Sequence, residues 1–193
     1  MFALLISVFS CHLAQNNQDP MASHDFSTLT ILVIDDNPHM RKILKTILRG
    51  FGVRHIVEVS DAVSGLEELS MTAIDIVLVD WMIGDIDGHE FTSMVRRNDD
   101  CTNVRVPIIM ISAHSERSNI ERARSAGIDE YLCKPVRPID LLSRIISVID
   151  NPRPFVKAAQ SFIGPDRRRK TMKNLEFGER RKNTAQTKNQ TLV

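Results

Sequence analysis

The sequence predicts an α/β fold, a doubly wound parallel sheet of five strands with five helices packed on its two faces. Apolar strand-like runs alternate with helix-like segments over residues 29–150. The strand-like runs are continuous stretches of Ile, Val and Leu, as in strands that are covered on both faces. The strand order 2-1-3-4-5 is one of two common solutions for such a unit, and it places the functional crevice outside the carboxyl ends of the strands.

The five strands are predicted at residues 30–34, 55–59, 76–79, 108–111 and 130–132. The first helix begins after Asn37 and Pro38, which suit the N-cap and the first turn. Its apolar residues have the spacing of a helix with one buried face; they are Met40, Ile43, Leu44, Ile47 and Leu48. Gly50 and Gly52 are expected to end this helix.

Four more helices are predicted from the same kind of pattern. The second covers residues 62–71, and the fourth runs from about 115 to 126 and ends at Gly127. The third follows Gly88, where Asp87 and Gly88 form a turn, and is expected to bury Phe91, Met94 and Val95. The fifth begins at Pro138 with the apolar residues Ile139, Leu142, Ile145, Ile146 and Ile149.

Charge divides the chain into an acidic body and a basic end. Residues 151–193 hold eleven Lys or Arg and three Asp or Glu, a net charge of +8, which leaves −7 on residues 1–150 because the whole chain carries +1. We predict a folded domain at 29–150 and a basic, largely disordered tail at 151–193. Within that tail, a short docking segment remains an alternative, formed by Phe155, Val156, Phe162 and Ile163.

Residues 1–28 are predicted to be an N-terminal extension, either disordered or an over-extended reading of the start site. Residues 2–9 are apolar, but the basic flank of a signal peptide is missing because the first Lys or Arg is Arg41. The chain contains no run of 18 apolar residues, so no membrane-spanning helix is predicted. The three cysteines have neither metal-ligand nor disulfide spacing, which favours a reducing, cytoplasmic location.

Acidic residues follow two of the predicted strands. Asp35 and Asp36 end the first strand and Asp80 ends the third. If these strands are parallel neighbours, the three carboxylates converge at one edge of the sheet, where their repulsion favours a bound cation. Carboxylate oxygens suit Mg²⁺, which also accepts phosphate oxygens.

A hydroxyl and an ammonium group follow the other two neighbouring strands. Ser112 comes after the fourth strand and can donate to a phosphoryl oxygen, and Lys134 comes after the fifth and can place a cation beside it. Together with the carboxylates and a metal, they would form a phosphoryl-transfer site that works by positioning and charge neutralisation.

Four runs, in order and at family spacing, resemble response regulator receiver domains: ILVIDDNPHMRKIL, IVLVDWMIGDIDGHEF, PIIMISAH and AGIDEYLCKP. The resemblance implies a flavodoxin-like fold with Asp80 as the phosphoacceptor and Asp35 and Asp36 as the acidic pair. It implies that Asp36, Asp80 and the backbone carbonyl of Met82 bind Mg²⁺ directly. Ser112 and Tyr131 would be the switch residues, and Lys134 would contact the phosphate.

Two further features follow from this resemblance. Pro135 matches a Lys-Pro pair that the family often joins by a cis peptide. Gly84 stands where the family usually has proline, which gives more backbone freedom to the loop that carries the metal-binding carbonyl.

The resemblance implies a signalling switch rather than an enzyme acting on external substrates. A histidine kinase or histidine phosphotransfer protein would phosphorylate Asp80, and the helix 4–strand 5–helix 5 face would then bind a downstream target. The protein would catalyse only its own phosphorylation and dephosphorylation.

Three alternatives stay open at this point. A phosphoester hydrolase of the haloacid dehalogenase type would need a second Asp two residues after the nucleophile, where this chain has Met82. The basic tail could bind nucleic acid through phosphate contacts, although it is too poor in apolar residues to form a DNA-binding domain. A non-phosphorylated scaffold is the third, and the complete set of site residues argues against it.

Overall fold

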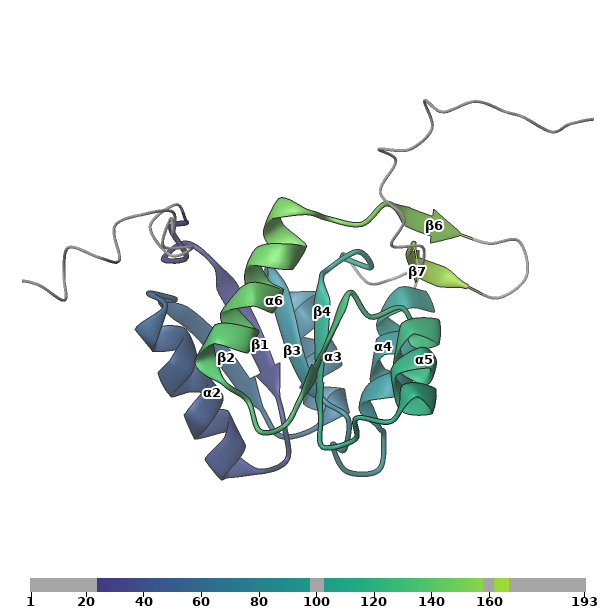
Figure 1. The fold of residues 1–193 in the computed structure, drawn as a ribbon, viewed down its shortest axis with the longest axis horizontal. Helices are drawn as coiled ribbons and strands as arrows, with labels where there is room; N and C mark the ends of the chain where they lie inside the picture. Colours follow the sequence, from purple (N-terminus) through teal and green to yellow (C-terminus); the bar gives the residue numbers. More distant parts are fainter. Residues whose placement is uncertain (1–23, 98–102, 158–161, 167–193) are drawn as a thin grey trace, which may run out of the picture.

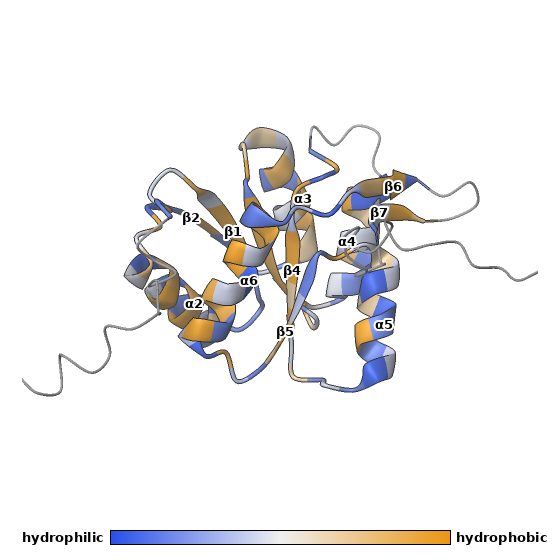
Figure 2. Ribbon diagram, turned by 45° about the horizontal axis from the view of Figure 1, so that its top comes forward, coloured by the Kyte–Doolittle hydropathy of each residue, from blue (hydrophilic) through white to orange (hydrophobic). Residues whose placement is uncertain are grey.

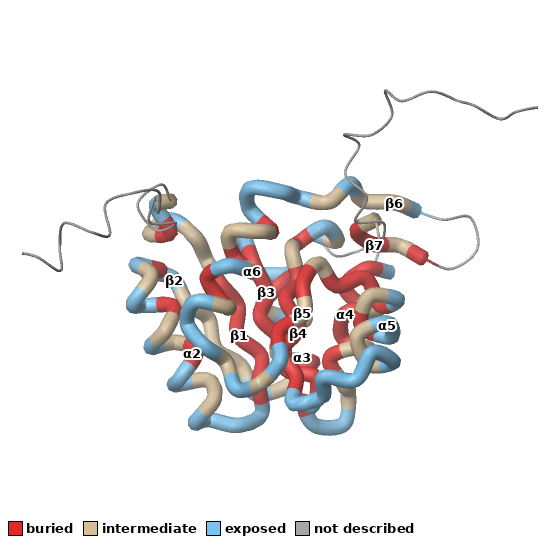
Figure 3. Tube along the Cα trace, in the orientation of Figure 1, coloured by how far each residue is buried: buried red, intermediate tan, exposed pale blue. Residues whose placement is uncertain are grey.

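The computed structural model describes residues 24–97, 103–157 and 162–166. Its main feature is a five-stranded parallel sheet in the order β2-β1-β3-β4-β5, which confirms the predicted fold (Figure 1). The strands are β1 (Thr30–Ile34), β2 (His55–Val59), β3 (Ile76–Asp80), β4 (Ile108–Ser112) and β5 (Glu130–Cys133). β3 and β4 are buried at every position, which explains their unbroken apolar sequences (Figure 2, Figure 3).

Helices cover both faces of the sheet. α2 (Pro38–Gly50) and α6 (Pro138–Asp150) pack on one face, where Ile31 and Val33 of β1 point. α3 (Ala62–Met71), α4 (Gly88–Arg97) and α5 (Arg117–Ala126) pack on the other, where Leu32 and Ile34 point. The alternation of side chains along each strand thus divides the core into two layers.

The pairing register brings the chemically interesting residues to one edge. Ile34 pairs with Val79, Asp80 with Ile111, and Ser112 with Cys133. All four strands run in the same direction, so the residues that end or follow them lie together at the carboxyl edge. The predicted meeting of the ends of strands one, three, four and five is therefore confirmed.

Two predicted helix-end residues, Asn37 and Gly127, lie at the ends of their helices in the structure. The Asn37 side chain accepts hydrogen bonds from the backbone N–H groups of His39 and Met40, which caps α2. Gly127 ends α5 with φ 103°, a left-handed conformation that glycine adopts without a Cβ clash.

The predicted buried faces of three helices are partly wrong. Ile43, Met94, Ile139 and Ile149 are exposed, whereas Arg96 is only 2% exposed. In α6 the buried residues are Leu141, Leu142, Ile145 and Val148. Apolar spacing alone does not decide which residues of these helices face the sheet.

The domain boundaries also differ from the predicted ones. Phe26, inside the predicted N-terminal extension, is 3% exposed in the core, and His24 Nε2 lies 2.9 Å from Asp150 Oδ1. Inside the predicted disordered tail, β6 (Phe155–Lys157) and β7 (Ile163–Pro165) form an antiparallel pair. Phe26 packs in the same core layer as Ile31 and Val33, and β7 contacts α4, so both segments pack on the folded domain although they lie outside residues 29–150.

The remaining predictions for the two ends concern residues outside the described ranges. They are the alternative start site and apolar run within 1–23, and the basic run within 167–193. Among the residues that the structure does describe, none of the helices combines the length and apolar character needed to cross a bilayer.

Candidate functional site

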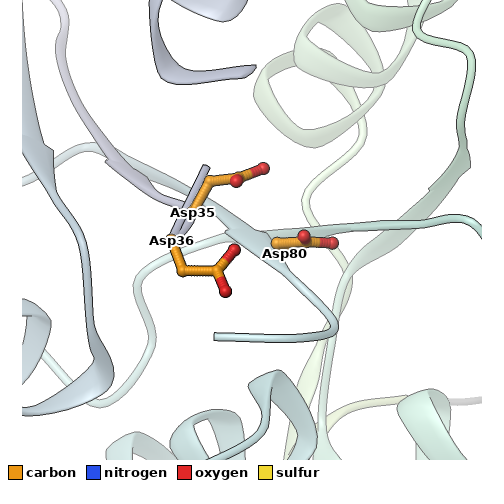
Figure 4. Close-up of side chains that lie close together, drawn as sticks. All are labelled: Asp35, Asp36 and Asp80. Atoms are coloured by element: carbon orange, nitrogen blue, oxygen red, sulfur yellow. The ribbon is translucent and has the colours of Figure 1, made fainter. Parts of the chain in front are cut away.

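Three carboxyl groups meet at the carboxyl edge of the sheet. Asp35 and Asp36 directly follow β1, and Asp80 is the last residue of the neighbouring β3 (Figure 4). Ligand oxygens of all three residues lie within 4.8 Å of one another. Asp35 and Asp80 are buried while Asp36 is exposed, so the cluster is open to solvent on one side.

Two hydrogen bonds to Asp35 hold the backbone directly after β1. The N–H of Asn37 donates to Asp35 Oδ1 at 2.9 Å, and Arg41 Nη1 donates to the Asp35 carbonyl oxygen at 2.6 Å. These bonds fix the chain where it leaves the strand and enters α2. The role of Arg41 was missed from sequence, because a charged residue on a surface helix carries no signal of where its side chain turns.

Lys134 brings the opposite charge to this cluster. Its Nζ lies 2.7 Å from Asp80 Oδ2 and 3.3 Å from Asp35 Oδ2. Its backbone N–H donates to the Ser112 carbonyl at 2.7 Å, which continues the β4–β5 pairing past the end of β5. The Lys134–Pro135 peptide is cis, as the resemblance suggested.

Burial and charge act in opposite directions on this pair. Burial raises the pKa of Asp80, the nearby Asp35 adds to the rise, and the hydrogen bond and charge of Lys134 offset only part of it. Burial alone would lower the pKa of Lys134, but the bonds and charges of Asp80 and Asp35 outweigh it and raise that pKa. Lys134 therefore stays a cation beside two carboxyl groups.

The donor set fits a hard divalent cation. Three carboxyl groups lie together beside the Lys134 ammonium, and the Arg41 guanidinium donates to the backbone carbonyl of Asp35. Oxygen ligands with an open side suit Mg²⁺, which keeps several of its waters. Met82 follows Asp80 by two residues in the β3–α4 loop. Its carbonyl as a metal ligand stays a prediction.

The two predicted switch residues are linked through the backbone of His114. Ser112 is fully buried, and its Oγ accepts a hydrogen bond from the His114 N–H at 3.0 Å. The Tyr131 hydroxyl donates to the His114 carbonyl at 2.6 Å. The β4–α5 loop is thus tied both to the end of β4 and to β5.

A model of the response regulator receiver domain family matches residues 31–146. The chain belongs to this family. The matched segment lies inside the predicted domain at 29–150 and contains every predicted site residue.

Relatives of the receiver domain include small chemotaxis proteins. The chain is 28% identical over 122 residues to the chemotaxis protein CheY-3 of Vibrio cholerae, which covers 63% of this chain and 92% of that protein. The chemotaxis protein CheY of Pseudomonas aeruginosa is also 28% identical over 122 residues, with 63% and 97% covered. These matches support a role in two-component response regulation.

Solved structures show the same fold. A response regulator from Chloroflexus aurantiacus has a TM-score of 0.59 and 25% identity, over 64% of this chain and 98% of that one. The receiver domain of the sensor histidine kinase PA1611 from Pseudomonas aeruginosa has a TM-score of 0.55 and 28% identity, over 62% and 94%. That structure has a magnesium ion coordinated in its active-site cleft.

Trp81 ties Asp80 of this receiver domain to its surroundings. Its backbone N–H donates to Asp80 Oδ1 at 2.7 Å and to the Ile111 carbonyl at 2.8 Å. Its ring is 6% exposed, and the Arg122 guanidinium carbon lies 5.5 Å from the ring centroid. This Arg122 contact could not be predicted from sequence, because α5 has the pattern of a polar surface helix.

Gly88 allows α4 to begin directly against the backbone that carries Asp80. A Cβ at this position would lie 2.3 Å from the Asp80 carbonyl oxygen, and the Gly88 N–H donates to the Trp81 carbonyl at 2.8 Å.

We expect Gly88→Ala to lower the free energy of unfolding by at least about 2 kcal/mol in urea titrations, since backbone cannot give way as a side chain can. Gly50→Ala is the control, because nothing lies within 4 Å of its added Cβ. A Gly88→Ala protein as stable as this control would contradict the assigned contact.

Proposed function

We propose that this receiver domain accepts a phosphoryl group on Asp80 from the phosphohistidine of a histidine kinase or histidine phosphotransfer protein. The observation that carries the proposal is the position of Lys134 Nζ, 2.7 Å from Asp80 Oδ2 and 3.3 Å from Asp35 Oδ2. An ammonium group at this point neutralises charge where an incoming phosphoryl oxygen would sit.

The residues divide the transfer between them. A carboxylate oxygen of Asp80 forms the new bond to phosphorus while the bond from phosphorus to the donor imidazole nitrogen breaks, and the imidazole leaves. The Trp81 N–H holds the Asp80 carboxylate through Oδ1 and so limits its rotation. Lys134 and the Ser112 hydroxyl would each donate a hydrogen bond to one oxygen of the transferred phosphoryl group.

Mg²⁺ is proposed as the cofactor of this step. Asp36, Asp80 and the Met82 carbonyl would hold it directly, with Asp35 completing the acidic pair. Bound there, it would neutralise the charge that builds up between the phosphoryl oxygens and the carboxylates. The three clustered carboxyl groups and the magnesium ion in the receiver domain of PA1611 support this proposal.

The output would be a change in a protein-binding face. A phosphoryl group that attracts the Ser112 hydroxyl would break its hydrogen bond with the His114 N–H. The backbone of His114 would then be free to move, and the hydrogen bond between its carbonyl and the Tyr131 hydroxyl would change with it. The surface formed by α5, β5 and α6, which is the helix 4–strand 5–helix 5 face of the sequence analysis, would be reshaped for a target protein. We place this exchange in the cytoplasm, and the protein would act on no substrate other than its own Asp80.

The predicted alternative of a phosphoester hydrolase lacks support at its key position. Such a mechanism needs a carboxylate two residues after the nucleophile to protonate the leaving group. Met82 stands there, and its side chain is 59% exposed.

Incubation with acetyl phosphate and Mg²⁺ tests the phosphoacceptor. The wild-type chain should gain one phosphoryl group by intact-mass spectrometry, and hydroxylamine should remove it, since an acyl phosphate is cleaved by this nucleophile. Asp80→Asn should gain none because an amide oxygen is too weak a nucleophile.

Asp85→Asn is the matched control, because Asp85 is an exposed carboxylate in the same loop that takes no part in the proposed site. It should be labelled like the wild type. Labelling of the Asp80→Asn protein to the wild-type level would rule out Asp80 as the acceptor.

A further inference from the structure

A short segment beyond the family match lies at the end of the sheet opposite Asp80. The match ends at residue 146, and β6 and β7 follow it as an antiparallel pair, which we call the β6–β7 pair. The pair lies beside the ends of α4 and α5 that point away from the carboxyl edge, and β7 contacts α4 (Figure 1). It is therefore an addition to the shared domain at the amino-terminal edge of the sheet.

Contacts with α4 and with the end of α5 hold the β6–β7 pair in place. The guanidinium carbons of Arg96 and Arg105 lie 5.6 and 5.5 Å from the centroid of the Phe155 ring. Gly164 packs so closely on the backbone of Gly127 that a Cβ at position 164 would lie 2.9 Å from the Gly127 Cα. The pair thus has a fixed position relative to both helices.

Exposed cations gather around the β6–β7 pair. Arg97 is the last residue of α4, Lys157 is the last residue of β6, and Arg105 lies on the aromatic ring of β6. Arg124 adds a half-exposed cation in the last turn of α5. Arg97 and Arg124 also suit the carboxyl ends of their helices, but Arg105 and Lys157 lie outside any helix. We call these four residues the basic corner.

The carboxyl groups closest to this corner are already paired with other arginines. Asp129 Oδ2 lies 3.1 Å from Arg96 Nη2, and Glu130 Oε1 lies 3.1 Å from Arg153 Nη2. Within the described parts of the chain, no carboxylate forms an ion pair with any of the four cations of the basic corner. Their charges are therefore available to an anionic partner.

The chain continues from the β6–β7 pair with more positive charge. The Asp166 N–H donates to the Pro154 carbonyl at 2.8 Å, so the chain leaves the pair beside the start of β6. Residues 167–170 are Arg-Arg-Arg-Lys, directly after this fixed point. Asp166 and the two aspartates of residues 98–102 offset only part of this charge.

A surface of this kind suits a partner with a regular array of negative charges. Duplex DNA carries one phosphate charge per about 1.7 Å of its axis, and cations that contact the phosphates release condensed counterions. Residues 1–150 carry a net charge of −7, which repels a polyanion from most of the domain. Binding is therefore confined to the basic corner and the residues that follow it.

Two other anionic partners fit this surface less well. Basic segments that bind membranes also carry apolar side chains that insert among the lipids. Within the described residues, none of the exposed large apolar side chains lies in α5 or in the β6–β7 pair. Single strands stack their bases on exposed aromatic rings. Phe162 is only 7% exposed, and Phe155 is already in contact with two guanidinium groups.

We propose that the basic corner binds the phosphate backbone of duplex DNA without regard to base sequence. The β6–β7 pair serves this binding because it brings Lys157, Arg105 and the start of the basic run onto one surface. The surface lies at the edge of the sheet opposite Asp80, so DNA and a phosphodonor can be bound at the same time. The inference does not depend on the phosphoacceptor role of Asp80.

The test is a titration of the full chain against a fluorescent DNA duplex of about 20 base pairs, followed by anisotropy between 50 and 200 mM salt. For the wild type, the logarithm of the affinity should fall with the logarithm of the salt concentration with a slope of at least about 4 in magnitude. A chain carrying Arg97→Gln, Arg105→Gln and Lys157→Gln should lose about 2–3 of this slope, because each phosphate contact contributes roughly 0.9. An unchanged slope in this variant overturns the basic corner, even if DNA binds.

The control chain carries Lys42→Gln, Arg49→Gln and Arg54→Gln. These changes remove the same charge at exposed positions in α2 and in the loop after it. The control should keep the wild-type slope, and equal losses in the two variants would show an effect of net charge alone and overturn the proposal. Urea unfolding of both variants, with midpoints equal to that of the wild type, shows that the loss is not one of folding.

A second arm separates DNA from a membrane surface. The wild-type chain should sediment with DNA and not with vesicles of equal parts phosphatidylcholine and phosphatidylglycerol. Binding to the vesicles without binding to DNA overturns the proposal, and so does binding to neither. The Asp80→Asn chain should bind DNA as the wild type does, so failure of phosphorylation and failure of DNA binding are read separately.

Discussion

Replacement of Lys134 by methionine is expected to slow the phosphorylation of Asp80 by about 100- to 1000-fold, the usual cost of removing one preorganised charge-stabilising donor. Methionine keeps much of the length of the side chain but removes the ammonium group that lies 2.7 Å from Asp80 Oδ2. The rate of mass gain with acetyl phosphate, measured at fixed Mg²⁺, gives the effect directly.

Lys134→Arg is the matched control for charge. It keeps the positive charge with a different shape, so it should retain far more activity than the methionine variant. Removal of the ammonium also leaves the three carboxylates uncompensated, so Mg²⁺ should stabilise the methionine variant against heat more than it stabilises the wild type. Unchanged phosphorylation of Lys134→Met would exclude the role assigned to this residue.

Arg96→Met is expected to lower the free energy of unfolding by about 3–5 kcal/mol, the range found when one partner of a buried ion pair is removed. Arg96 Nε donates to the Gly127 carbonyl at 2.9 Å, and Nη1 donates to the carbonyls of Val104 and Val106 at 2.7 and 2.9 Å. Nη2 lies 3.1 Å from Asp129 Oδ2. Loss of the guanidinium leaves all of these acceptors buried without this donor.

The pH dependence of this loss has a definite sign. Burial raises the pKa of Asp129, and the charge of Arg96 offsets part of the rise. In the variant this pKa should rise further, so the ionised carboxylate destabilises the fold at neutral pH, and the penalty should shrink in acid once Asp129 is protonated.

Arg97→Met serves as the control, since Arg97 is the exposed next residue of the same helix. Its effect should stay within about 0.5 kcal/mol in urea unfolding. Similar losses from the two variants would show that the buried network around Arg96 does not carry the stability assigned to it.

The fold and the grouping of the site residues could be predicted from sequence for one physical reason. A parallel sheet buried on both faces demands continuous apolar strands, so β1, β3 and β4 are visible as runs of Ile, Val and Leu. Once the strands are parallel, residues that follow them must share an edge. Asp35, Asp80 and Lys134 therefore came together as expected, although nothing in the sequence gives the 2.7 Å and 3.3 Å separations.

The buried position of Arg96 and the β6–β7 pair could not be predicted in this way. The apolar stripe of α4 pointed to Met94, but the space at the end of this helix is lined by carbonyl oxygens and Asp129, which only a guanidinium satisfies. β6 and β7 are three residues long, too short to display a period. Phe155 and Phe162 were noticed as a docking segment, but the guanidinium groups that flank Phe155 come from distant parts of the chain.

The position of Trp81 has a practical consequence for spectroscopy. It is the sole tryptophan of the chain, so nearly all intrinsic fluorescence at long wavelength originates one peptide bond from Asp80. A change of charge on that carboxylate, or a shift of Arg122 over the indole, alters the electric field at the ring. Emission of the unlabelled protein should therefore report metal binding and acyl-phosphate formation in real time, with no reporter group introduced near the site.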